Sequence, residues 1–214
     1  MRILYILGTG GFAKEVAQVA TAIQEAGPPR WRDIEFLAQG EAEIGRMLTF
    51  GRVAGTDALL SNLDRPADVA IGIGHPGLRR TIAQRLAAWP HLQAPNLVHP
   101  AAGLDPRRVR LGLGNLVASG AQFTCDIEVG DFNVFNLNCT VGHDARIGSY
   151  GVVNPGANVS GGVVLGDACL LGTGSQVLEG RSLCADVIIG AGAVVTRNIA
   201  EPGTYAGVPA RSIK

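Results

Sequence analysis

Neither sign of charge is in excess in this sequence, which has 18 Lys and Arg residues against 18 Asp and Glu residues. Electrostatic attraction therefore gives no reason to expect nucleic acid or an acidic membrane surface as a partner. A long apolar run is also missing at the N-terminus. Residues 3–7 are apolar but glycines follow at once, so the run is too short for a membrane span or a signal-peptide core. We expect a cytoplasmic protein.

Cysteine and aromatic residues are scarce, whereas glycine is abundant. The four cysteines, Cys125, Cys139, Cys169 and Cys184, form no CxxC pair and have no zinc-like spacing to histidine. We expect them to be packed free thiols in a reducing compartment. An aromatic content of 5% together with 30 glycines suits tightly stacked repeats.

An apolar residue recurs at every sixth position from Leu111 to Val195, without insertion or deletion. Strands alternate every two residues and helices repeat every 3.6, so this period fits neither. It is typical of a parallel β-helix of hexapeptide repeats, in which each short strand points one anchor inward. The residue two before each anchor is mostly small, which lets stacked coils approach. The residue after the anchor is often glycine, which we expect because the chain turns a corner there.

Residues 1–95 have a different pattern, typical of a βαβαβ unit. Apolar runs predict strands at residues 3–7, 34–37 and 68–73, and helices at 12–25, 57–63 and 78–89, with Asp57 in the helix cap. Residues 40–52 look irregular. The turn Gly8-Thr9-Gly10-Gly11 between the first strand and helix could hold a phosphate on its N–H groups. The spacing is not the GxGxxG fingerprint, so a purely structural turn is an equal alternative.

The two patterns divide the chain. The hexapeptide period starts soon after residue 95 and ends near Pro202, and the last residues lack it. We therefore expect an α/β domain at residues 1–95, a β-helix domain at 96–202 and a C-terminal tail at 203–214.

His143 is the only histidine inside the uninterrupted repeat, and its surroundings suggest chemistry. It follows the anchor Val141 by two residues, in a coil otherwise built of small and apolar residues. The adjacent Asp144 could orient the imidazole and raise its basicity, and Asn136 and Asn138 lie one hexapeptide earlier. An ordinary surface histidine would also fit this position. The combination nevertheless predicts a general base with helper groups.

The sequence lacks the residues that a zinc site or a covalent nucleophile would require. A hexapeptide-repeat zinc site needs a histidine from each of several positions around the β-helix, and only His143 falls there. The sequence has no Gly-x-Ser-x-Gly elbow and no Cys–His signature of a covalent nucleophile. A base without its own nucleophile implies that an amine or hydroxyl of the substrate attacks a bound acyl donor directly.

Five segments together resemble one family. They are LGTGGFAKEV at 7–16, AIGIGHPGLRR at 70–80, VGHDARIG at 141–148, NPGANVSGGVVLG at 154–166 and GVPAR at 207–211. Their order resembles that of the sialic-acid-cluster and bacillosamine-type sugar acyltransferases. The resemblance implies that the first domain is Rossmann-like and binds a nucleotide sugar, and that the β-helix is left-handed. It also implies a homotrimer with active sites at the subunit interfaces and no metal.

The reaction that the resemblance implies is transfer of the acetyl group of acetyl-CoA to a nucleotide-linked amino sugar. The acceptor in this family is most often the 4-amino group of a UDP-, dTDP- or GDP-4-amino-4,6-dideoxyhexose. Such a product would enter polysaccharide biosynthesis.

The matching positions carry roles over to this sequence. They imply His143 as the general base, Asp144 as its orienting carboxylate and the N–H of Gly161 as the oxyanion donor. The implied nucleotide-sugar site consists of Gly8, Gly10, Gly11, Gly74, Arg79 and Asn136. The implied acetyl-CoA site consists of Thr173, Gly174, Ala191, Pro209 and Arg211.

The sequence also departs from the family pattern. The second strand usually ends in an acidic residue that meets the base or ribose, whereas this chain has Ala38-Gln39 there. His75-Pro76 replaces Asp-Asn or Asn-Asn after the third strand. Some relatives have a second histidine nine residues after the base, where this chain has Val152. The nucleotide therefore stays open. Either a second histidine is not needed, or this protein handles its donor differently.

Alternatives to N-acetylation also stay open. O-acetylation of a sugar hydroxyl on the same scaffold is the nearest, and the sequence barely separates the two. A non-catalytic nucleotide-sugar-binding trimer would bind its ligand without binding CoA. A nucleotidyltransferase is disfavoured, because residues 8–14 lack the Arg- and Lys-bearing glycine loop of those enzymes.

Overall fold

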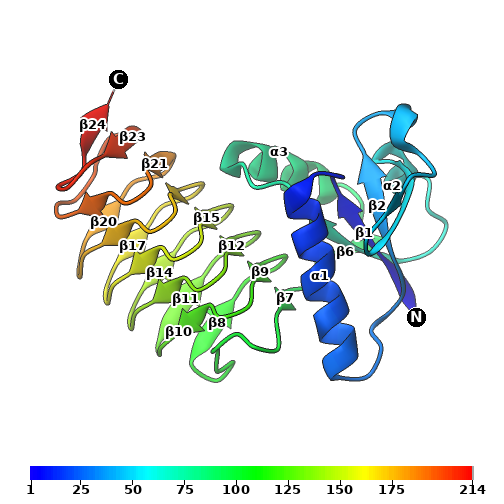
Figure 1. The fold of residues 1–214 in the computed structure, drawn as a ribbon, viewed down its shortest axis with the longest axis horizontal. Helices are drawn as coiled ribbons and strands as arrows, with labels where there is room; N and C mark the ends of the chain where they lie inside the picture. Colours follow the sequence, from blue (N-terminus) through cyan, green and yellow to red (C-terminus); the bar gives the residue numbers. More distant parts are fainter. Residues whose placement is uncertain (214) are drawn as a thin grey trace.

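The computed structural model describes residues 1–213 and joins two differently built parts (Figure 1). An α/β unit, coloured blue to cyan-green, surrounds one sheet, and the coils that follow it stack along an axis as a parallel β-helix. The expected fold, a Rossmann-like unit followed by a left-handed parallel β-helix of hexapeptide repeats, is confirmed.

The sheet of the α/β unit has six strands in the order β3-β4-β2-β1-β5-β6. The central strand β1 lies between β2 and β5 and is parallel to both. The elements are β1 (Arg2–Leu7), α1 (Gly11–Ala26), β2 (Trp31–Ala38), the 3-10 helix η1 (Glu41–Glu43), β3 (Met47–Leu48), β4 (Gly51–Thr56), α2 (Ala58–Ser61), β5 (Ala67–Ile71), α3 (Pro76–Leu86) and β6 (Leu92–Gln93).

The strands and helices expected in this unit are present, with shifted ends and additions. The segment 40–52, expected to be irregular, contains η1 and β3 and the start of β4, which pairs in parallel with β2. Asp57 precedes α2, but its side chain makes no capping hydrogen bond, contrary to the expectation. Its Oδ2 instead lies 2.5 Å from Nη2 of Arg85 in α3.

The β-helix has three sheets, which we name after one strand of each, β12, β13 and β14, and whose strands are parallel except for β24. The β13 sheet is β10-β13-β16-β19-β22, the β14 sheet is β20-β17-β14-β11-β8, and the β12 sheet runs from β7 through β9, β12, β15, β18 and β21 to β23 and β24. Residues 18 positions apart pair across neighbouring coils, as Val141 does with Val159. All sixth-position anchors except the first, half-buried Leu111, are buried, which confirms the predicted repeat.

Most strands of this part are two residues long. They are β7 (Leu97–Val98), β8 (Val109–Leu111), β9 (Leu116–Val117), β10 (Gln122–Phe123), β11 (Ile127–Val129), β12 (Val134–Phe135), β13 (Thr140–Val141), β14 (Arg146–Ile147), β15 (Val152–Val153), β16 (Asn158–Val159), β17 (Val164–Leu165), β18 (Leu170–Leu171), β19 (Gln176–Val177), β20 (Ser182–Leu183), β21 (Val187–Ile189), β22 (Val194–Val195), β23 (Gly203–Ala206) and β24 (Arg211–Ile213).

The corners between the sheets are built differently from the expectation. Left-handed backbone falls two residues after the expected glycines, for example at Phe132, Asp144 and Tyr150, with φ of 55°, 59° and 65°. The glycines directly after the anchors serve close approach instead. A Cβ on Gly142 would lie 2.5 Å from the backbone nitrogen of Gly161 in the next coil.

The tail is hydrogen-bonded to the last coil although it lacks the period. β23 pairs in parallel with β21, and β24 folds back antiparallel on β23. The N–H of Ala210 donates to the carbonyl oxygen of Val194 at 2.8 Å. The described part of the tail therefore covers the C-terminal end of the β-helix.

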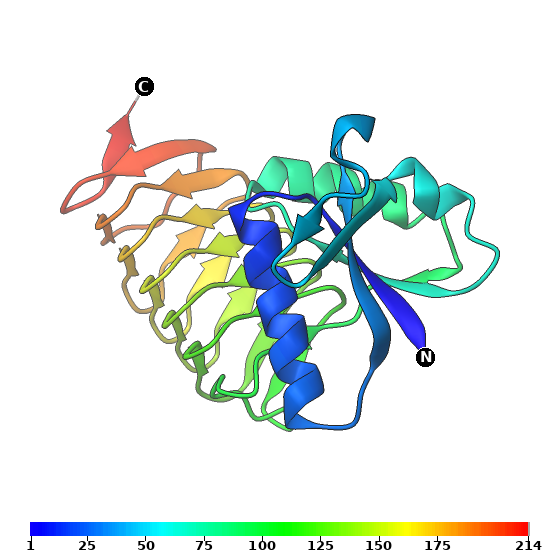
Figure 2. The same ribbon diagram turned by 45° about the vertical axis from the view of Figure 1, so that its right-hand side comes forward.

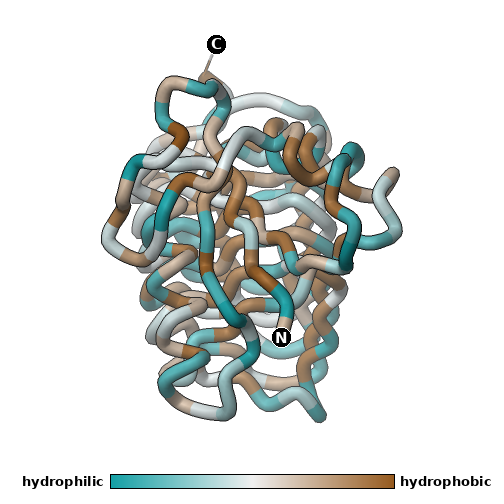
Figure 3. Tube along the Cα trace, turned by 90° about the vertical axis from the view of Figure 1, so that its right-hand side faces the viewer, coloured by the Kyte–Doolittle hydropathy of each residue, from teal (hydrophilic) through white to brown (hydrophobic). Residues whose placement is uncertain are grey.

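The helix α1 joins the two parts, because it lies between the α/β sheet and the β12 sheet (Figure 2). One buried cluster contains Leu4 of β1, Val16 of α1 and Leu116, Val134 and Val152 of the β12 sheet. Figure 3 shows hydrophobic stretches in brown through the middle of the α/β unit and hydrophilic positions in teal on its peripheral loops. The shared core fixes the α/β unit against the β-helix.

All four cysteines are free thiols. Cys139 and Cys169 are buried inside the β-helix and Cys184 is half-buried, in keeping with packed thiols. Cys125 is exposed at a corner, so the expectation of packing is wrong for this residue.

Candidate active site

His143 stands on the corner that connects the β13 sheet to the β14 sheet, between β13 and β14. Its imidazole is 57% exposed, and Nδ1 lies 2.8 Å from Oδ2 of Asp144, which is 69% exposed. The two side chains form a hydrogen-bonded pair. Because the carboxylate engages Nδ1, Nε2 is the ring nitrogen with a lone pair available for a proton.

The surroundings of His143 make it a stronger base. The hydrogen bond to Asp144 raises the pKa of the imidazole above its ordinary value, and the charges of Asp144 and Glu179 raise it further. Loss of some hydration acts in the opposite direction. A base strengthened in this way remains accessible to a substrate, because the ring is exposed.

Gly161 occupies the equivalent corner position in the next coil. A Cβ on Gly161 would lie 2.5 Å from Nε2 of His143, so the imidazole occupies the space that a side chain would need. The N–H of Gly161 donates to no group within residues 1–213, whereas that of Gly162 donates to the carbonyl oxygen of His143 at 2.7 Å. A free backbone donor beside Nε2 could bind an oxyanion next to the base.

A cavity of about 370 Å³ opens in the α/β unit at the carboxyl ends of β1 and β2. In parallel sheets of this type, nucleotides bind at this edge. Gly8 and Thr9 line the cavity from the turn after β1, and Gln39 lines it after β2. Gly8 has a left-handed φ of 113°, and a Cβ there would lie 3.1 Å from the carbonyl oxygen of Gly72. Only glycine suits this turn.

Two carboxylates in this cavity, Glu43 and Asp57, escaped the sequence analysis as candidate ligands. Glu43 comes from η1, and its Oε1 accepts a hydrogen bond from Oγ1 of Thr9 at 3.1 Å. For Glu43 the available signal was its place near a second acidic residue, Glu41, in a segment expected to be irregular. Glu43 brings a carboxylate to the edge of the sheet although β2 itself does not end in one.

The other predicted glycines lie around the N-terminus of α1. A Cβ on Gly10 or Gly11 would meet nothing within 4 Å, and one on Gly74 would meet only Cδ1 of Phe12, at 4.0 Å. All three backbones are therefore open to close approach. The first N–H groups of a helix favour a phosphate, and binding of the diphosphate here stays a prediction.

Arg79 is buried, with 1% of its surface exposed. Its Nη1 donates to the carbonyl oxygens of Ile71 and Ile73, and its Nε donates to that of Phe132 in the β-helix, each at 2.9 Å. Burial lowers the pKa of Arg79 to about 9. The guanidinium thus joins the end of β5 to a β-helix corner, and a direct contact with substrate stays a prediction.

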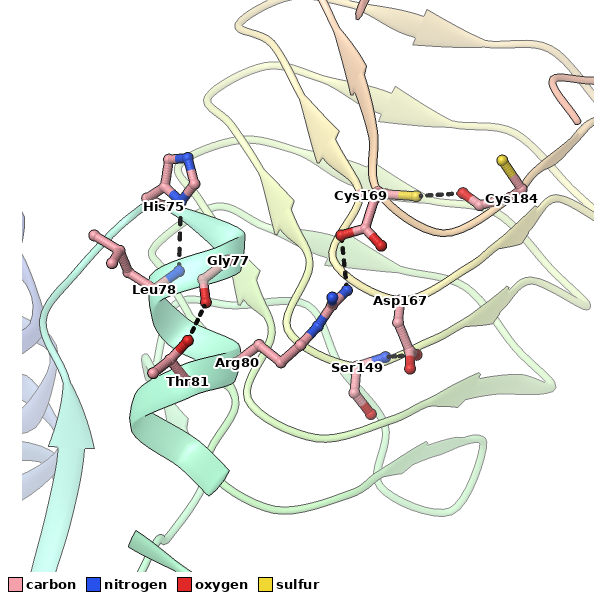
Figure 4. Close-up of polar contacts among 10 residues, drawn as sticks. His75, Gly77, Leu78, Arg80, Thr81, Ser149, Asp167, Cys169 and Cys184 are labelled. Carbon is pink, nitrogen blue, oxygen red and sulfur yellow. Dashed lines mark hydrogen bonds and ion pairs between the residues drawn. The ribbon is translucent and has the colours of Figure 1, made fainter. Parts of the chain in front are cut away.

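The neighbouring Arg80 makes a second, more exposed connection. Figure 4 shows it extending from α3 towards the coils of the β-helix, where Ser149 and Asp167 are hydrogen-bonded to each other. Its Nη2 lies 2.9 Å from Oδ1 of Asp186. Both arginines of the segment therefore contact the β-helix, Arg79 through the carbonyl oxygen of Phe132 and Arg80 through an ion pair.

Asn136 lines a smaller cavity of about 180 Å³ between α1 and the β-helix. It is 9% exposed, and its Oδ1 accepts the N–H of Leu137 at 2.8 Å. His99 lies in the same cavity, with Nδ1 accepting the N–H of Ala101. His99 precedes the hexapeptide period, so the repeat gave no reason to select it.

The residues expected to bind acetyl-CoA gather near the C-terminal end of the β-helix. Thr173, Gly174 and Ala191 share the corner between the β12 and β13 sheets, where the N–H of Gly192 donates to Thr173 at 2.9 Å. Pro209 and Arg211 flank Ala210, which is bonded to β22. Within one chain the β13 sheet separates this corner from that of His143.

Two kinds of feature are absent from the part of the chain that the structure describes. Residues 1–213 contain no group of three or more His, Cys, Asp or Glu side chains that could hold a metal ion. None of the described helices combines the length and apolar character that crossing a bilayer requires.

Comparison with known proteins gives the family. Residues 3–86 match the PglD N-terminal domain. The acetyltransferase domain of PglB from Neisseria gonorrhoeae FA1090 is 30% identical with a TM-score of 0.91, covering 100% of both chains. The same domain has been solved in complex with acetyl coenzyme A. No curated protein sequence matches the chain.

Two other solved structures are similar over nearly their whole length. PerB from Caulobacter crescentus, in complex with CoA and GDP-perosamine, is 28% identical with a TM-score of 0.86, covering 99% of this chain and 97% of that one. WeeI from Acinetobacter baumannii AYE is 25% identical with a TM-score of 0.87, covering 100% of both chains. The chain therefore belongs to the bacillosamine-type sugar acyltransferase family, whose members are enzymes that combine a PglD N-terminal domain with a β-helix.

Proposed function

We propose that this chain transfers the acetyl group of acetyl-CoA to the amino group of a nucleotide-linked amino sugar, with His143 as general base. The observation that carries the mechanism is the position of the His143–Asp144 pair beside the free N–H of Gly161. The similarity to PerB, solved with CoA and GDP-perosamine, supports the classes of donor and acceptor.

Each group has one task. Nε2 of His143 accepts a proton from the amine as its nitrogen attacks the thioester carbonyl carbon, while Asp144 holds the ring through Nδ1. The N–H of Gly161 donates to the carbonyl oxygen as negative charge develops there. When the tetrahedral intermediate collapses, the C–S bond breaks, and the CoA thiolate leaves and takes up the proton.

Direct attack without an acyl-enzyme is supported by the surroundings of His143. Cys125 carries an exposed thiol and occupies the equivalent corner position one coil earlier, which makes it the candidate nucleophile stacked next to His143. Nδ1 of His143 is bound to Asp144 and Nε2 lies towards Gly161, in the following coil. Nδ1 is therefore occupied, and Nε2 lies away from Cys125, so neither ring nitrogen is placed to activate that thiol.

We further propose that the chain acts as a homotrimer. The corner with Thr173, Gly174 and Ala191 and the corner of His143 border opposite edges of the β13 sheet. A neighbouring chain that brings its acetyl-CoA corner to His143 would complete the site. Analytical ultracentrifugation should give three times the chain mass, and a monomer with full activity would contradict this arrangement.

The central test is His143→Ala with a panel of acceptors. Release of CoA from acetyl-CoA is followed with UDP-, dTDP- and GDP-linked 4-amino sugars and with their hydroxy counterparts. We expect activity with an amino sugar and a loss of about 10²- to 10⁴-fold in kcat for the variant, the usual contribution of a general base. Full activity of the variant would remove His143 from the mechanism, and a preference for hydroxyl acceptors would favour O-acetylation.

A further inference from the structure

The corner of His143 continues as a column of residues along the β-helix. Each coil is hydrogen-bonded to the one before it by the same backbone contact. The N–H of Asp144 donates to the carbonyl oxygen of Cys125, that of Gly162 to the carbonyl oxygen of His143, and that of Gly180 to the carbonyl oxygen of Gly161. The residues that follow the column positions also share left-handed φ values. The repeated geometry stacks Cys125, His143, Gly161 and Glu179 in register.

Glu179 is the next side chain in the column after His143, because Gly161 has none. Neighbouring coils are spaced like strands of a sheet, about 4.8 Å apart. A Cβ on Gly161 would lie 2.5 Å from Nε2 of His143. Nε2 therefore lies roughly one strand spacing, about 5 Å, from the level of the Glu179 Cβ. A group hydrogen-bonded to Nε2 is within reach of the Glu179 carboxylate.

The carboxylate of Glu179 has no partner among residues 1–213, although two arginines are close in the chain. Arg181 donates from Nε to the backbone carbonyl oxygen of Glu179 at 3.0 Å, and neither Arg181 nor Arg197 forms an ion pair with the side chain. Glu179 is exposed. Its negative charge also acts on His143, since it contributes to the raised pKa of that imidazole after Asp144. An unpaired, exposed carboxylate at this place is suited to a cation that arrives with the substrate.

We propose that the carboxylate of Glu179 binds the ammonium form of the acceptor's amino group beside His143, and that it thereby selects amines over hydroxyls. The inference rests on the proposed function, since it assigns the acceptor class at that same site. A sugar amine is partly protonated near neutral pH and gains a charge-assisted hydrogen bond from a carboxylate. A sugar hydroxyl is neutral and gains less.

The test compares an amino acceptor with its hydroxy counterpart. The probes are GDP-perosamine and GDP-rhamnose, or the matching UDP- or dTDP-linked pair if the wild-type enzyme prefers that nucleotide. Calorimetry gives Kd for both probes, and CoA release gives kcat and KM. The variants are Glu179→Gln, which keeps the shape without the charge, and Glu179→Asp, which keeps the charge. Glu25→Gln, at the exposed end of α1, is the matched control.

We expect Glu179→Gln to raise Kd and KM for the amino sugar about 10- to 100-fold, the contribution of one charge-assisted hydrogen bond. Kd for the hydroxy sugar and KM for acetyl-CoA should change less than about twofold, and Glu179→Asp should recover part of the loss. Unchanged amino-sugar binding in Glu179→Gln, or equal losses for both probes, would overturn the proposal and leave the proposed function standing. If the wild-type enzyme acetylates no amino sugar, the proposed function itself fails.

Discussion

The imidazole of His143 occupies the space in which Gly161 would carry a side chain, with Nε2 only 2.5 Å from the position of a Cβ. The relationship ties the proposed base and the proposed backbone donor to neighbouring coils of one rigid element. A geometry built on stacked strands holds reacting groups more tightly than one built on loops. The distance between the proposed base and the proposed oxyanion donor is therefore set by the β-helix itself.

The first prediction follows from this contact. In Gly161→Ala the new methyl group must displace the imidazole, and a misplacement of about 1 Å can cost about 10²-fold in rate. We expect kcat to fall by that order while KM for acetyl-CoA changes little. The thermal unfolding midpoint should hardly change, because His143 is exposed and can move.

The matched control is Gly27→Ala, another glycine without a left-handed φ. Its nearest contact for a Cβ is the carbonyl oxygen of Ile23 at 4.0 Å. This variant should keep wild-type activity. If Gly161→Ala were as active as the control, the imidazole would not need its present position.

The second prediction concerns pH. His143 must be neutral to act as a base, and Asp144 raises its pKa, so activity should fall as the pH drops through that raised value. In Asp144→Asn the pKa of His143 should return towards its ordinary value. The acidic limb of the kcat/KM profile should then move to lower pH. The plateau should fall by about 10²-fold, because the ring loses its orienting partner.

Asparagine suits the backbone at residue 144. Asp144 has a φ of 59°, and Asn138 occupies an equivalent corner position at 55°. Asp126→Asn is the control, since Asp126 precedes Asp144 by one coil with a φ of 57°. A pH profile of Asp144→Asn that coincides with that of Asp126→Asn would show that the carboxylate does not tune the base.

The third prediction separates two adjacent arginines that both connect α3 to the β-helix. Arg79→Met leaves three carbonyl oxygens of Ile71, Ile73 and Phe132 without their donor. We expect a loss of about 3–5 kcal/mol in the free energy of unfolding, as for breaking a buried charged contact. Arg80→Met removes only a partly exposed ion pair with Asp186 and should cost less than about 1 kcal/mol.

Urea unfolding of the two variants checks this difference. In Arg79→Met, the affinity for a nucleotide sugar should fall together with the free energy of unfolding. The guanidinium holds the carbonyl oxygens at the end of β5, on the side of the sheet where the nucleotide is expected to bind. Equal stability losses in the two variants would contradict the assignment of Arg79 as the main connection.

The sequence pattern predicted the β-helix well because each anchor obeys one local rule, burial of every sixth side chain. It predicted the corners less well. The glycines after the anchors were expected to form the corners, yet they allow the close approach of the next coil, as the contact of Gly142 with Gly161 shows. Only the stacking of coils reveals which of the two reasons applies.

The site was partly predictable for the same reason. His143 and Asp144 are neighbours in the sequence, so their pairing could be predicted from the sequence alone. The burial of Arg79 depends on Phe132, 53 residues away, and no sequence spacing shows that contact. The strand β4 was missed because its sequence GRVAGT is rich in glycine, and its pairing with β2 is also non-local.

The last prediction uses the cysteines as probes of the corner. Burial raises the pKa of Cys139 to about 12 and that of Cys169 to about 11, so both should stay protonated and unreactive at pH 8. Cys125 is exposed and should react first with iodoacetamide, as mass spectrometry of digested protein can show. Cys125→Ser should abolish the fast phase of labelling.

Because the His143 ring lies towards Gly161, in the following coil, Cys125→Ser should keep kcat within about twofold of wild type, well short of a general base's contribution. Rapid labelling of Cys139 would mean that the coils open in solution, and loss of activity in Cys125→Ser would place that thiol in the reaction.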